Sequence, residues 1–213
     1  MTLKDVPSLS IMDFLSVDIE CKKKEKKNKA NNKDFLLDNF SKCLSQDELS
    51  DVYLSYDDEN LYCVAHVLTS FKKSFYPDYH RGDCLEVFIN TRPSNESYVV
   101  TKFCHHFIFF PQQVEGLWGK EITKFRNDDM HENCSSKDLE VEVEKKTDSY
   151  IISCSIPFRC LHGFEIQNFE DIGFSYRINI ADQLPLDFVS SSFEYPIERL
   201  QLLWANVKFK GKK

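Results

Sequence analysis

Apolar and polar residues alternate along this chain in short runs, which is the pattern of β-strands that bury one face. Leu139, Val141 and Val143 alternate with three glutamates, which predicts a half-exposed strand. Clusters of Asp and Asn separate several runs, and these residues hydrogen-bond their own backbone in turns. The predicted strands cover residues 17–19, 52–56, 61–67, 83–90, 98–110, 139–144, 150–156, 172–181 and 201–209.

The connections between these runs narrow the fold class. Residues 57–60 are turn formers between two strand patterns, so 52–67 is predicted to be a hairpin. A proline opens a short helix near 157–162, where its missing N–H costs nothing, and Gly163 can close it. Residues 111–137 are expected to form a long excursion. Many short strands without an internal repeat favour an all-β, antiparallel sandwich of jelly-roll or immunoglobulin-like type.

Length and composition fit a single domain over residues 1–213 with a sizeable core. The chain is 42% hydrophobic and 14% aromatic, with 18 Phe and 9 Tyr, which is typical of globular proteins. Its net charge of -7 argues against a general nucleic-acid binder, because such proteins are usually basic. We therefore expect no nucleic-acid partner.

One segment departs from this acidic balance. Residues 22–33 carry seven lysines and one glutamate. Such a run repels itself and resists packing, so residues 21–49 are predicted to be a Lys-rich insertion or mobile loop. The alternative is that 22–33 contacts an anionic surface, such as a membrane or nucleic acid. No aromatic residue interrupts the run, which weakens the nucleic-acid version.

The eight cysteines include no C-x-x-C pair, and several fall inside apolar strand patterns, where a free cysteine behaves as a small hydrophobe. The N-terminal region has no apolar leader pattern, and no stretch approaches 18 apolar residues. These observations predict free thiols, no transmembrane segment and a cytoplasmic location. A disulfide framework and leaderless export remain alternatives.

Five sequence motifs follow one another in the order of a known family. They are YLSYDDENLYCVAHV, GDCLEVFINTR, YIISCSIPFRCL, IGFSYRINIAD and LLWANVKF. In this order the chain resembles β-sandwich domains of the family 9 carbohydrate-binding module group, which is DOMON-related. The resemblance covers residues 6–19 and 50–209 and implies a carbohydrate-binding-module-like fold.

A second likeness is to uncharacterised bacterial members of this group that carry DTR…RFCHxFxxxP. Here the corresponding residues are Asn90-Thr91-Arg92, then Lys102-Phe103-Cys104-His105-His106-Phe107, with Pro111. Sugar-binding members of family 9 clamp a sugar between two Trp side chains, and this chain aligns no such pair. Trp118 falls in the predicted excursion, and Trp204 falls where the family keeps a structural strand residue. The resemblance therefore transfers no sugar-site residue.

Candidate ligand contacts come from residue type and position instead. Sugars are held by aromatic faces and by planar hydrogen-bonding groups, which makes Tyr, Trp and Arg on one end of the sandwich suitable. Of the adjacent pair His105 and His106, one is expected to be packed and the other to reach a surface or cleft, because neighbours on a strand point to opposite faces. The predicted ligand-binding residues are Tyr76, Tyr79, Arg81, Trp118, His106 and Arg177, with Phe75 beside them. The alternative is that Phe75, Tyr76 and Tyr79 only cap the sandwich edge. Glu86 is expected to pair with Arg177 or Arg92.

Catalytic and metal chemistry has weaker support. Cys104 could act as a nucleophile that a distant histidine activates, but Cys104 falls in an apolar strand pattern and a buried thiol is generally inert. A zinc site recruiting His80, His131 or Cys134 lacks a second matched pair, and Met130-His131 is poorly placed for haem. Calcium could be held by the carboxylates of Asp57, Asp58, Glu59 and Asp83. Turn chemistry already explains Asp57, Asp58 and Glu59 without an ion. We predict no resident metal or cofactor, with calcium as the alternative.

The sequence as a whole predicts a non-catalytic binding domain for a glycan or another small ligand. The first alternative is a protein-interaction or structural subunit that uses the Lys-rich segment and exposed strands as contacts. The second is a hydrolase or metalloenzyme whose site is not visible in the sequence.

Overall fold

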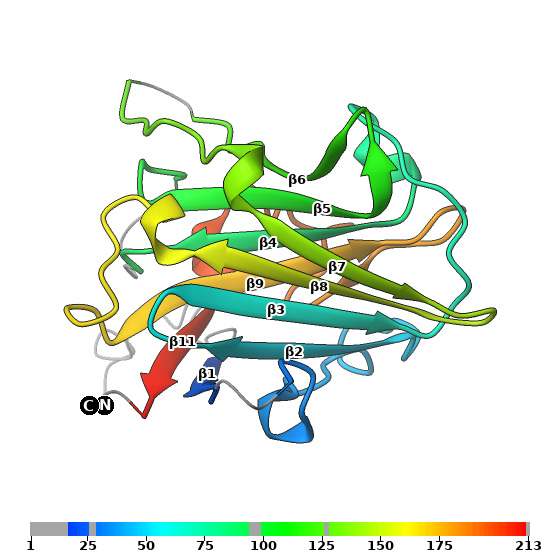
Figure 1. The fold of residues 1–213 in the computed structure, drawn as a ribbon, viewed down its shortest axis with the longest axis horizontal. Helices are drawn as coiled ribbons and strands as arrows, with labels where there is room; N and C mark the ends of the chain where they lie inside the picture. Colours follow the sequence, from blue (N-terminus) through cyan, green and yellow to red (C-terminus); the bar gives the residue numbers. More distant parts are fainter. Residues whose placement is uncertain (1–16, 26–28, 94–98, 126–127, 212–213) are drawn as a thin grey trace, which may run out of the picture.

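One continuous sheet folds over itself into two layers around an apolar core in this computed structural model (Figure 1). The structure describes residues 17–25, 29–93, 99–125 and 128–211. Neighbouring strands follow the order β6-β5-β4-β9-β11-β1-β2-β3-β8-β7, and β10 pairs with β9. The strands are β1 (Asp18–Lys23), β2 (Ser50–Tyr56), β3 (Asn60–Val67), β4 (Cys84–Asn90), β5 (Cys104–Val114), β6 (Leu117–Glu121), β7 (Glu140–Lys145), β8 (Tyr150–Pro157), β9 (Asp171–Asn179), β10 (Leu186–Asp187) and β11 (Ala205–Lys210).

All helices in the described ranges are short 3-10 helices. These are η3 (Lys33–Phe35), η4 (Tyr79–Arg81), η5 (Ser136–Asp138), η6 (Phe158–Cys160) and η7 (Gln201–Leu203). No helix in the described ranges has the length and apolar character needed to cross a membrane.

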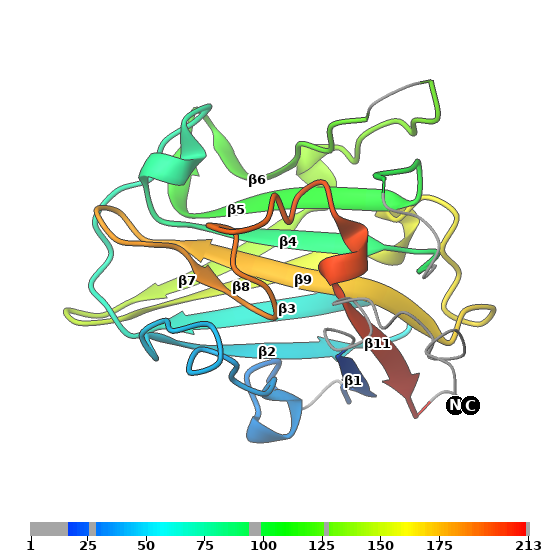
Figure 2. The same cartoon turned by 180° about the vertical axis from the view of Figure 1, so that it is seen from behind.

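The inner faces of both layers supply the main core. On β4, Leu85, Val87 and Ile89 point into it, whereas Glu86 and Phe88 point to the outer face. Every position of β4 is nevertheless buried, because loops cover the outer face as well. The connection between β9 and β11, coloured orange to red, crosses this face in Figure 2. The sheet therefore has a second, partly covered surface on which polar side chains are shielded from water.

Several sequence predictions are confirmed. The all-β class holds, and β2 and β3 form the predicted hairpin, with Ser50 opposite Val67 and Tyr56 opposite Leu61. The short helix appears as η6, and Gly163 follows it at φ 70°, a left-handed conformation that favours glycine. The alternating glutamates of β7 are exposed, as expected for a strand with one wet face.

The predicted excursion at 111–137 was wrong in its first part. β5 begins only at Cys104 and continues to Val114, and a two-residue turn returns it as β6. Glu115 and Gly116 have φ values of 50° and 81°, as a tight hairpin turn of the right twist requires. The turn signal at these two residues is weak, because a glutamate rarely takes the first left-handed position.

The two ends of the described chain also differ from expectation. The predicted strand 201–209 starts instead at Ala205, because Gln201–Leu203 form η7 and Trp204 precedes the strand. β11 pairs in parallel with β1, which runs to Lys23. The predicted loop 21–49 therefore begins with strand residues. Its later part anchors Phe35 and Leu37, which are both buried.

A glycine in β6 makes the packing of the β5–β6 hairpin testable. A Cβ at Gly119 would lie 2.6 Å from Cδ1 of the fully buried Phe109. We expect Gly119→Ala to lower the free energy of unfolding by about 1–3 kcal/mol, because the core must shift to admit the methyl group. Urea denaturation measures the change. Gln112→Ala, at an exposed position of β5, is the control and should stay within about 0.5 kcal/mol of wild type. A wild-type midpoint for Gly119→Ala would contradict this packing.

Candidate functional site

A row of buried polar side chains crosses the outer face of β4, β5 and β9. Glu86 on β4 lies opposite Arg177 on β9, and His106 comes from β5 on the other side. Small apolar clusters flank the row on both sides. The side chain of Glu86 is 0% exposed, so its charge needs partners from the protein itself.

Glu86 receives hydrogen bonds at both carboxylate oxygens. Arg177 donates from Nε to Oε1 at 2.6 Å and from its terminal nitrogen Nη2 to Oε2 at 2.8 Å. His106 donates from Nε2 to Oε2 at 2.7 Å, and Asn179 donates to Oε1 at 2.6 Å. The bidentate contact of Arg177 with Glu86 is the strong form of an arginine–carboxylate pair. The prediction that Glu86 pairs with Arg177 or Arg92 is resolved in favour of Arg177.

These contacts set the ionisation of the row. Burial alone would raise the pKa of Glu86, but the hydrogen bonds from His106 and Arg177 outweigh it and hold the pKa well below its ordinary value. Burial lowers the pKa of His80, whose Nδ1 lies 3.7 Å from Glu86, although the carboxylate opposes this shift. At neutral pH Glu86 is therefore ionised, and the imidazole of His80 beside it is neutral.

A cleft of about 240 Å³ opens above this row. Its walls come mainly from η4, from the residues after β6 and from the connection between β10 and β11. The lining residues are Tyr79, His80, Val100, His106, Lys124, Phe125, Glu198 and Arg199. The cleft combines aromatic rings with hydrogen-bonding and charged groups of both signs.

The structure brings three of the predicted ligand residues together. Tyr79 and His106 line the cleft with their rings 6.4 Å apart and nearly perpendicular. Arg177 and His106 both bond the Glu86 carboxylate, and Nη1 of Arg177 lies 3.7 Å from Glu198 of the cleft wall.

The other predicted residues lie outside the cleft. Tyr76 packs edge-on against Phe110 and accepts a hydrogen bond from Lys120. Arg81 is exposed beside Asp78, and Trp118 is exposed on β6. The sequence groups them with Tyr79 as aromatic and charged residues on loops at one end of the sandwich, but the η4 turn and the pleat of β6 direct them elsewhere.

Of the eight residues that line the cleft, the sequence predicted only Tyr79 and His106 as ligand contacts. Lys124, Phe125, Glu198 and Arg199 lie in connections without a regular pattern. Their charge and aromatic character offered a residue-type signal, but nothing in the spacing indicated that two connections far apart in sequence meet over one face. His80 also reaches this cleft, where the sequence had suggested it only as a metal ligand.

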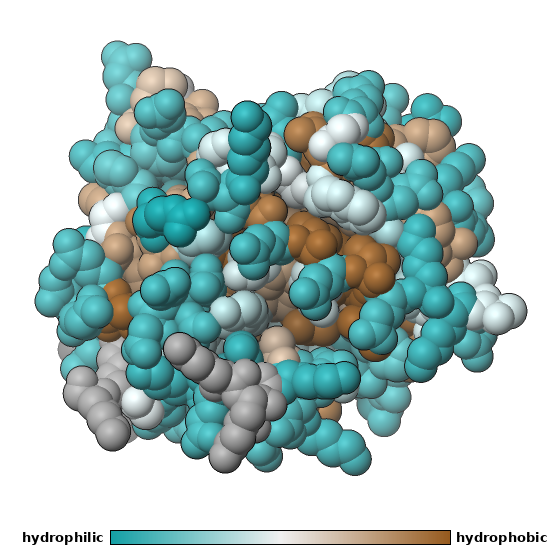
Figure 3. Space-filling view, in the orientation of Figure 1, coloured by the Kyte–Doolittle hydropathy of each residue, from teal (hydrophilic) through white to brown (hydrophobic). Residues whose placement is uncertain are grey.

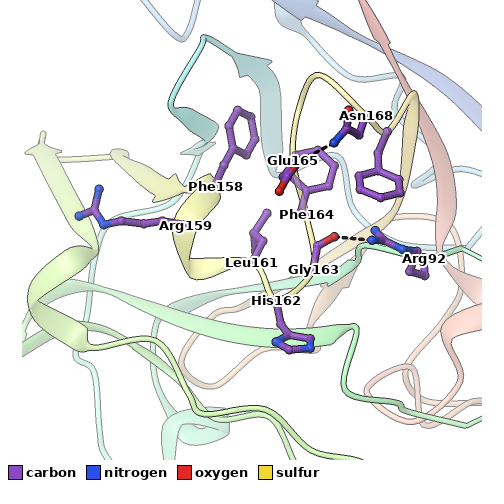
Figure 4. Close-up of a pocket in the computed structure, with 10 residues that line it drawn as sticks. Arg92, Phe158, Arg159, Leu161, His162, Gly163, Phe164, Glu165 and Asn168 are labelled. Carbon is purple, nitrogen blue, oxygen red and sulfur yellow. Dashed lines mark hydrogen bonds between the residues drawn. The ribbon is translucent and has the colours of Figure 1, made fainter.

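A larger cavity of about 600 Å³ lies at η6 and the residues that follow it (Figure 4). Arg92, one of the two arginines that line it, donates to the carbonyl oxygens of Thr91 and Gly163, and its guanidinium stacks 3.4 Å over the ring of Phe169. Arg92 thus stabilises the loop that forms the cavity. We favour the smaller cleft as the functional site because a buried charged row forms its floor.

A third hollow, of about 380 Å³, is lined in part by residues of the Lys-rich segment. Figure 3 views the face with β3, β8 and β7, where hydrophobic residues gather among hydrophilic ones. Lys24 and Lys29 line one side of this hollow, and three glutamates of β7 line the other. Lys24 also lies 4.6 Å from the centre of the Tyr62 ring. These lysines therefore face acidic side chains of the same chain.

The second histidine of the pair, His105, belongs to a separate buried network. As expected, it points away from His106, and it donates from Nδ1 to Glu121 at 2.8 Å. Glu121 also contacts His131 at 2.9 Å and accepts a bond from the backbone N–H of Cys134 at 2.6 Å. Burial would raise the pKa of Glu121, but these bonds prevail and lower it to about 2. Glu121 organises the connection that follows β6.

The residues considered for calcium have protein donors. Asp57 accepts backbone N–H groups of Glu59 and Asn60, both at 2.9 Å, as a turn residue does. Asp83 accepts backbone N–H groups of Lys72 and Ala181. The turn interpretation explains Asp57, whereas Asp83 joins segments far apart in sequence, and calcium binding at these carboxylates stays a prediction.

Comparison with known proteins places the chain in a family. Residues 24–188 match the family described as carbohydrate family 9 binding domain-like. The chain belongs to this carbohydrate family 9 binding domain-like family. No curated protein matches the chain.

Solved structures of family 9 modules share the fold of this family 9-like domain. A family 9 carbohydrate-binding module from Caldicellulosiruptor kristjanssonii, in complex with glucose, is similar with a TM-score of 0.62 and 13% identity. The match covers 92% of this chain and 97% of the module. The module from the same organism in complex with cellotriose gives a TM-score of 0.60 at 14% identity, over 92% and 95% of the two chains. At such identities the likeness shows the fold alone.

The Glu86 network predicts acid sensitivity in the family 9-like domain. Because the pKa of Glu86 is below its ordinary value of 4.5 in the folded state, its ionisation stabilises the fold above that pH. This contribution is lost as the pH falls below 4.5. We expect Glu86→Gln to cost about 3 kcal/mol at neutral pH, because Arg177 loses its buried carboxylate partner and keeps only the more distant Glu198.

Urea unfolding at a series of pH values checks this expectation. The gap between wild type and Glu86→Gln should narrow as the pH falls through the acid range. Glu142→Gln, on the exposed face of β7, is the control and should follow wild type throughout. A gap that stayed constant with pH would show that the loss at Glu86 is one of packing.

Proposed function

We propose that this chain is a non-catalytic binding domain that takes a saccharide in the cleft above Glu86. The observation that carries the proposal is the buried row of Glu86, Arg177 and His106 beneath a cleft with aromatic walls. Family membership supports the same reading, since the similar modules hold glucose and cellotriose.

The chemistry of the cleft suits a sugar ring. A saccharide offers C–H faces to aromatic rings and hydroxyl groups to planar polar side chains. Tyr79 and Phe125 supply the rings, and Glu198 and Arg199 supply charged hydrogen-bonding groups. The cleft volume of about 240 Å³ suits one sugar unit or the end of a chain better than a long internal stretch.

The ionisation of Glu86 supports a binding role over glycoside hydrolysis. Hydrolysis needs a carboxylic acid of raised pKa to protonate the leaving oxygen. Arg177 and His106 hold Glu86 as a carboxylate, and its oxygens already accept bonds from the protein. Glu86 is therefore suited to fixing its neighbours in place.

Titration calorimetry with glucose and with cellotriose tests the proposal. We expect at least one of the two to bind, and we expect Arg199→Ala to weaken that binding about tenfold, as the loss of one charged hydrogen bond would. Arg199 is exposed, so the variant should fold as wild type does. Arg81→Ala is the matched control, because Arg81 is exposed and outside the cleft.

Trp118 gives an independent check on the location of the site. It is 40% exposed on β6 and does not line the cleft. We therefore expect Trp118→Ala to bind the same sugar with wild-type affinity. Loss of binding in Trp118→Ala alone would move the site to β6. A failure of both sugars and of a broad glycan array would favour the protein-interaction role.

A further inference from the structure

Two thiols and a carboxylate converge at a place that the saccharide cleft does not use. The Sγ atoms of Cys134 and Cys160 and a carboxylate oxygen of Asp138 all lie within 4.8 Å of one another. Cys134 and Asp138 come from the connection between β6 and β7, whereas Cys160 ends η6. All three side chains are half-buried, so the group is held by the fold and still reached by solvent.

The fold fixes each member independently. The backbone N–H of Cys134 donates to the buried Glu121 carboxylate at 2.6 Å. Asp138 ends η5, whose first turn is capped by the side chain of Ser135. Cys160 ends η6, which the N–H of Leu161 closes on Phe158 at 3.0 Å. The convergence therefore does not depend on a contact between the three side chains themselves.

We propose that Cys134, Asp138 and Cys160 form a zinc site in which water takes the fourth position. Zinc bonds to sulfur at about 2.3 Å and to carboxylate oxygen at about 2.0–2.2 Å in a tetrahedron. Ligand atoms of such a tetrahedron are separated by about 3.5–4 Å, and the three atoms here all lie within 4.8 Å of one another. Two thiolates select zinc over calcium or magnesium, which prefer oxygen alone.

Arg159 supplies the support that such a site needs. Its guanidinium donates to Oδ1 of Asp138 at 3.0 Å. This bond orients the carboxylate and offsets the surplus negative charge that two thiolates and a carboxylate bring to one Zn²⁺. Partners of this kind behind the ligands usually matter for metal affinity.

The neighbouring group of His105, Glu121 and His131 does not suit a metal. Nε2 of His105 accepts the backbone N–H of His162 at 3.0 Å, so the ring proton is on Nδ1, which donates to Glu121. A metal on Nδ1 would need the opposite tautomer. Nδ1 of His131 donates to the carbonyl oxygen of Lys102 at 2.6 Å, so only its Nε2 faces the group, where it lies 2.9 Å from Oε1 of Glu121.

Zinc at this place would tie two connections together. The segment that holds Cys134 also holds His131, whose ring meets that of Phe125 edge-on at 4.8 Å. Phe125 is part of the cleft wall. The site would thus act as a clip between η6 and the connection that contributes to the cleft. Its existence does not depend on what the cleft binds.

Zinc titration of the reduced full-length chain tests the proposal, with Zn²⁺ alone as the probe and a phosphine reductant present. We expect one Zn²⁺ per chain by metal analysis after dialysis, and a melting temperature that rises with added zinc. Cys160→Ser should weaken binding about 100-fold or more, and Asp138→Asn about tenfold. Cys43→Ser, at an exposed cysteine elsewhere, is the matched control and should bind as wild type does.

Two results would overturn the zinc site. One is reduced wild-type protein that retains no zinc, whether or not Cys134 and Cys160 form a disulfide in air. The other is Cys160→Ser that binds zinc as tightly as Cys43→Ser. Because the wild-type stoichiometry is decisive by itself, the test stands even where a cysteine variant fails to fold.

Discussion

The burial of the Glu86 carboxylate is the constraint around which the candidate site is arranged. A carboxylate removed from water costs several kcal/mol unless it gains compensating partners. Arg177, His106 and Asn179 supply them from the two strands that flank β4. The register of β4 with β9 is therefore tied to the site, since a slip by one residue would send Glu86 into the apolar core.

A second buried carboxylate, Glu121 at the end of β6, has a comparable role beside the start of β5. It gathers His105, His131 and the backbone of Cys134. The adjacent residues His105 and His106 join the two networks to one strand, because they point to opposite faces. The cleft is thus linked to β5 through His106, and the group of Cys134, Asp138 and Cys160 is linked to β5 through Glu121 and His105. The two places use different chemistry.

The family relationship explains the fold better than it explains the site. The similar family 9 modules share 13–14% of their residues with this chain while matching over nine-tenths of its length. One fold hosts many activities, so the argument for a saccharide has to come from Glu86, Tyr79 and their neighbours. Zinc coordination by Cys134 and Cys160 would be a feature of this chain's loops, laid over the shared sheet.

Much of the fold could be predicted from local pattern. The period-two alternation of β7, β8 and β9 follows from the pleat, which sends neighbouring side chains to opposite faces, and turn residues predict the hairpin of β2 and β3. The β5–β6 hairpin could not be predicted, because it depends on Glu115 and Gly116 adopting left-handed backbone angles. The parallel pairing of β1 with β11 joins residues nearly the whole chain apart, which no local pattern encodes.

The sequence by itself determined the strand content, the opposite directions of His105 and His106, and the need of Glu86 for a cationic partner. Only the tertiary structure decided that this partner is Arg177 and that Arg92 instead supports the loop at Gly163. It also brought Phe125 and Arg199 to one cleft and Cys134 to Cys160. The physical reason is that alternation and turn chemistry act between near neighbours in sequence. Which loops meet over a sheet depends instead on the register and order of strands that pair across the whole chain.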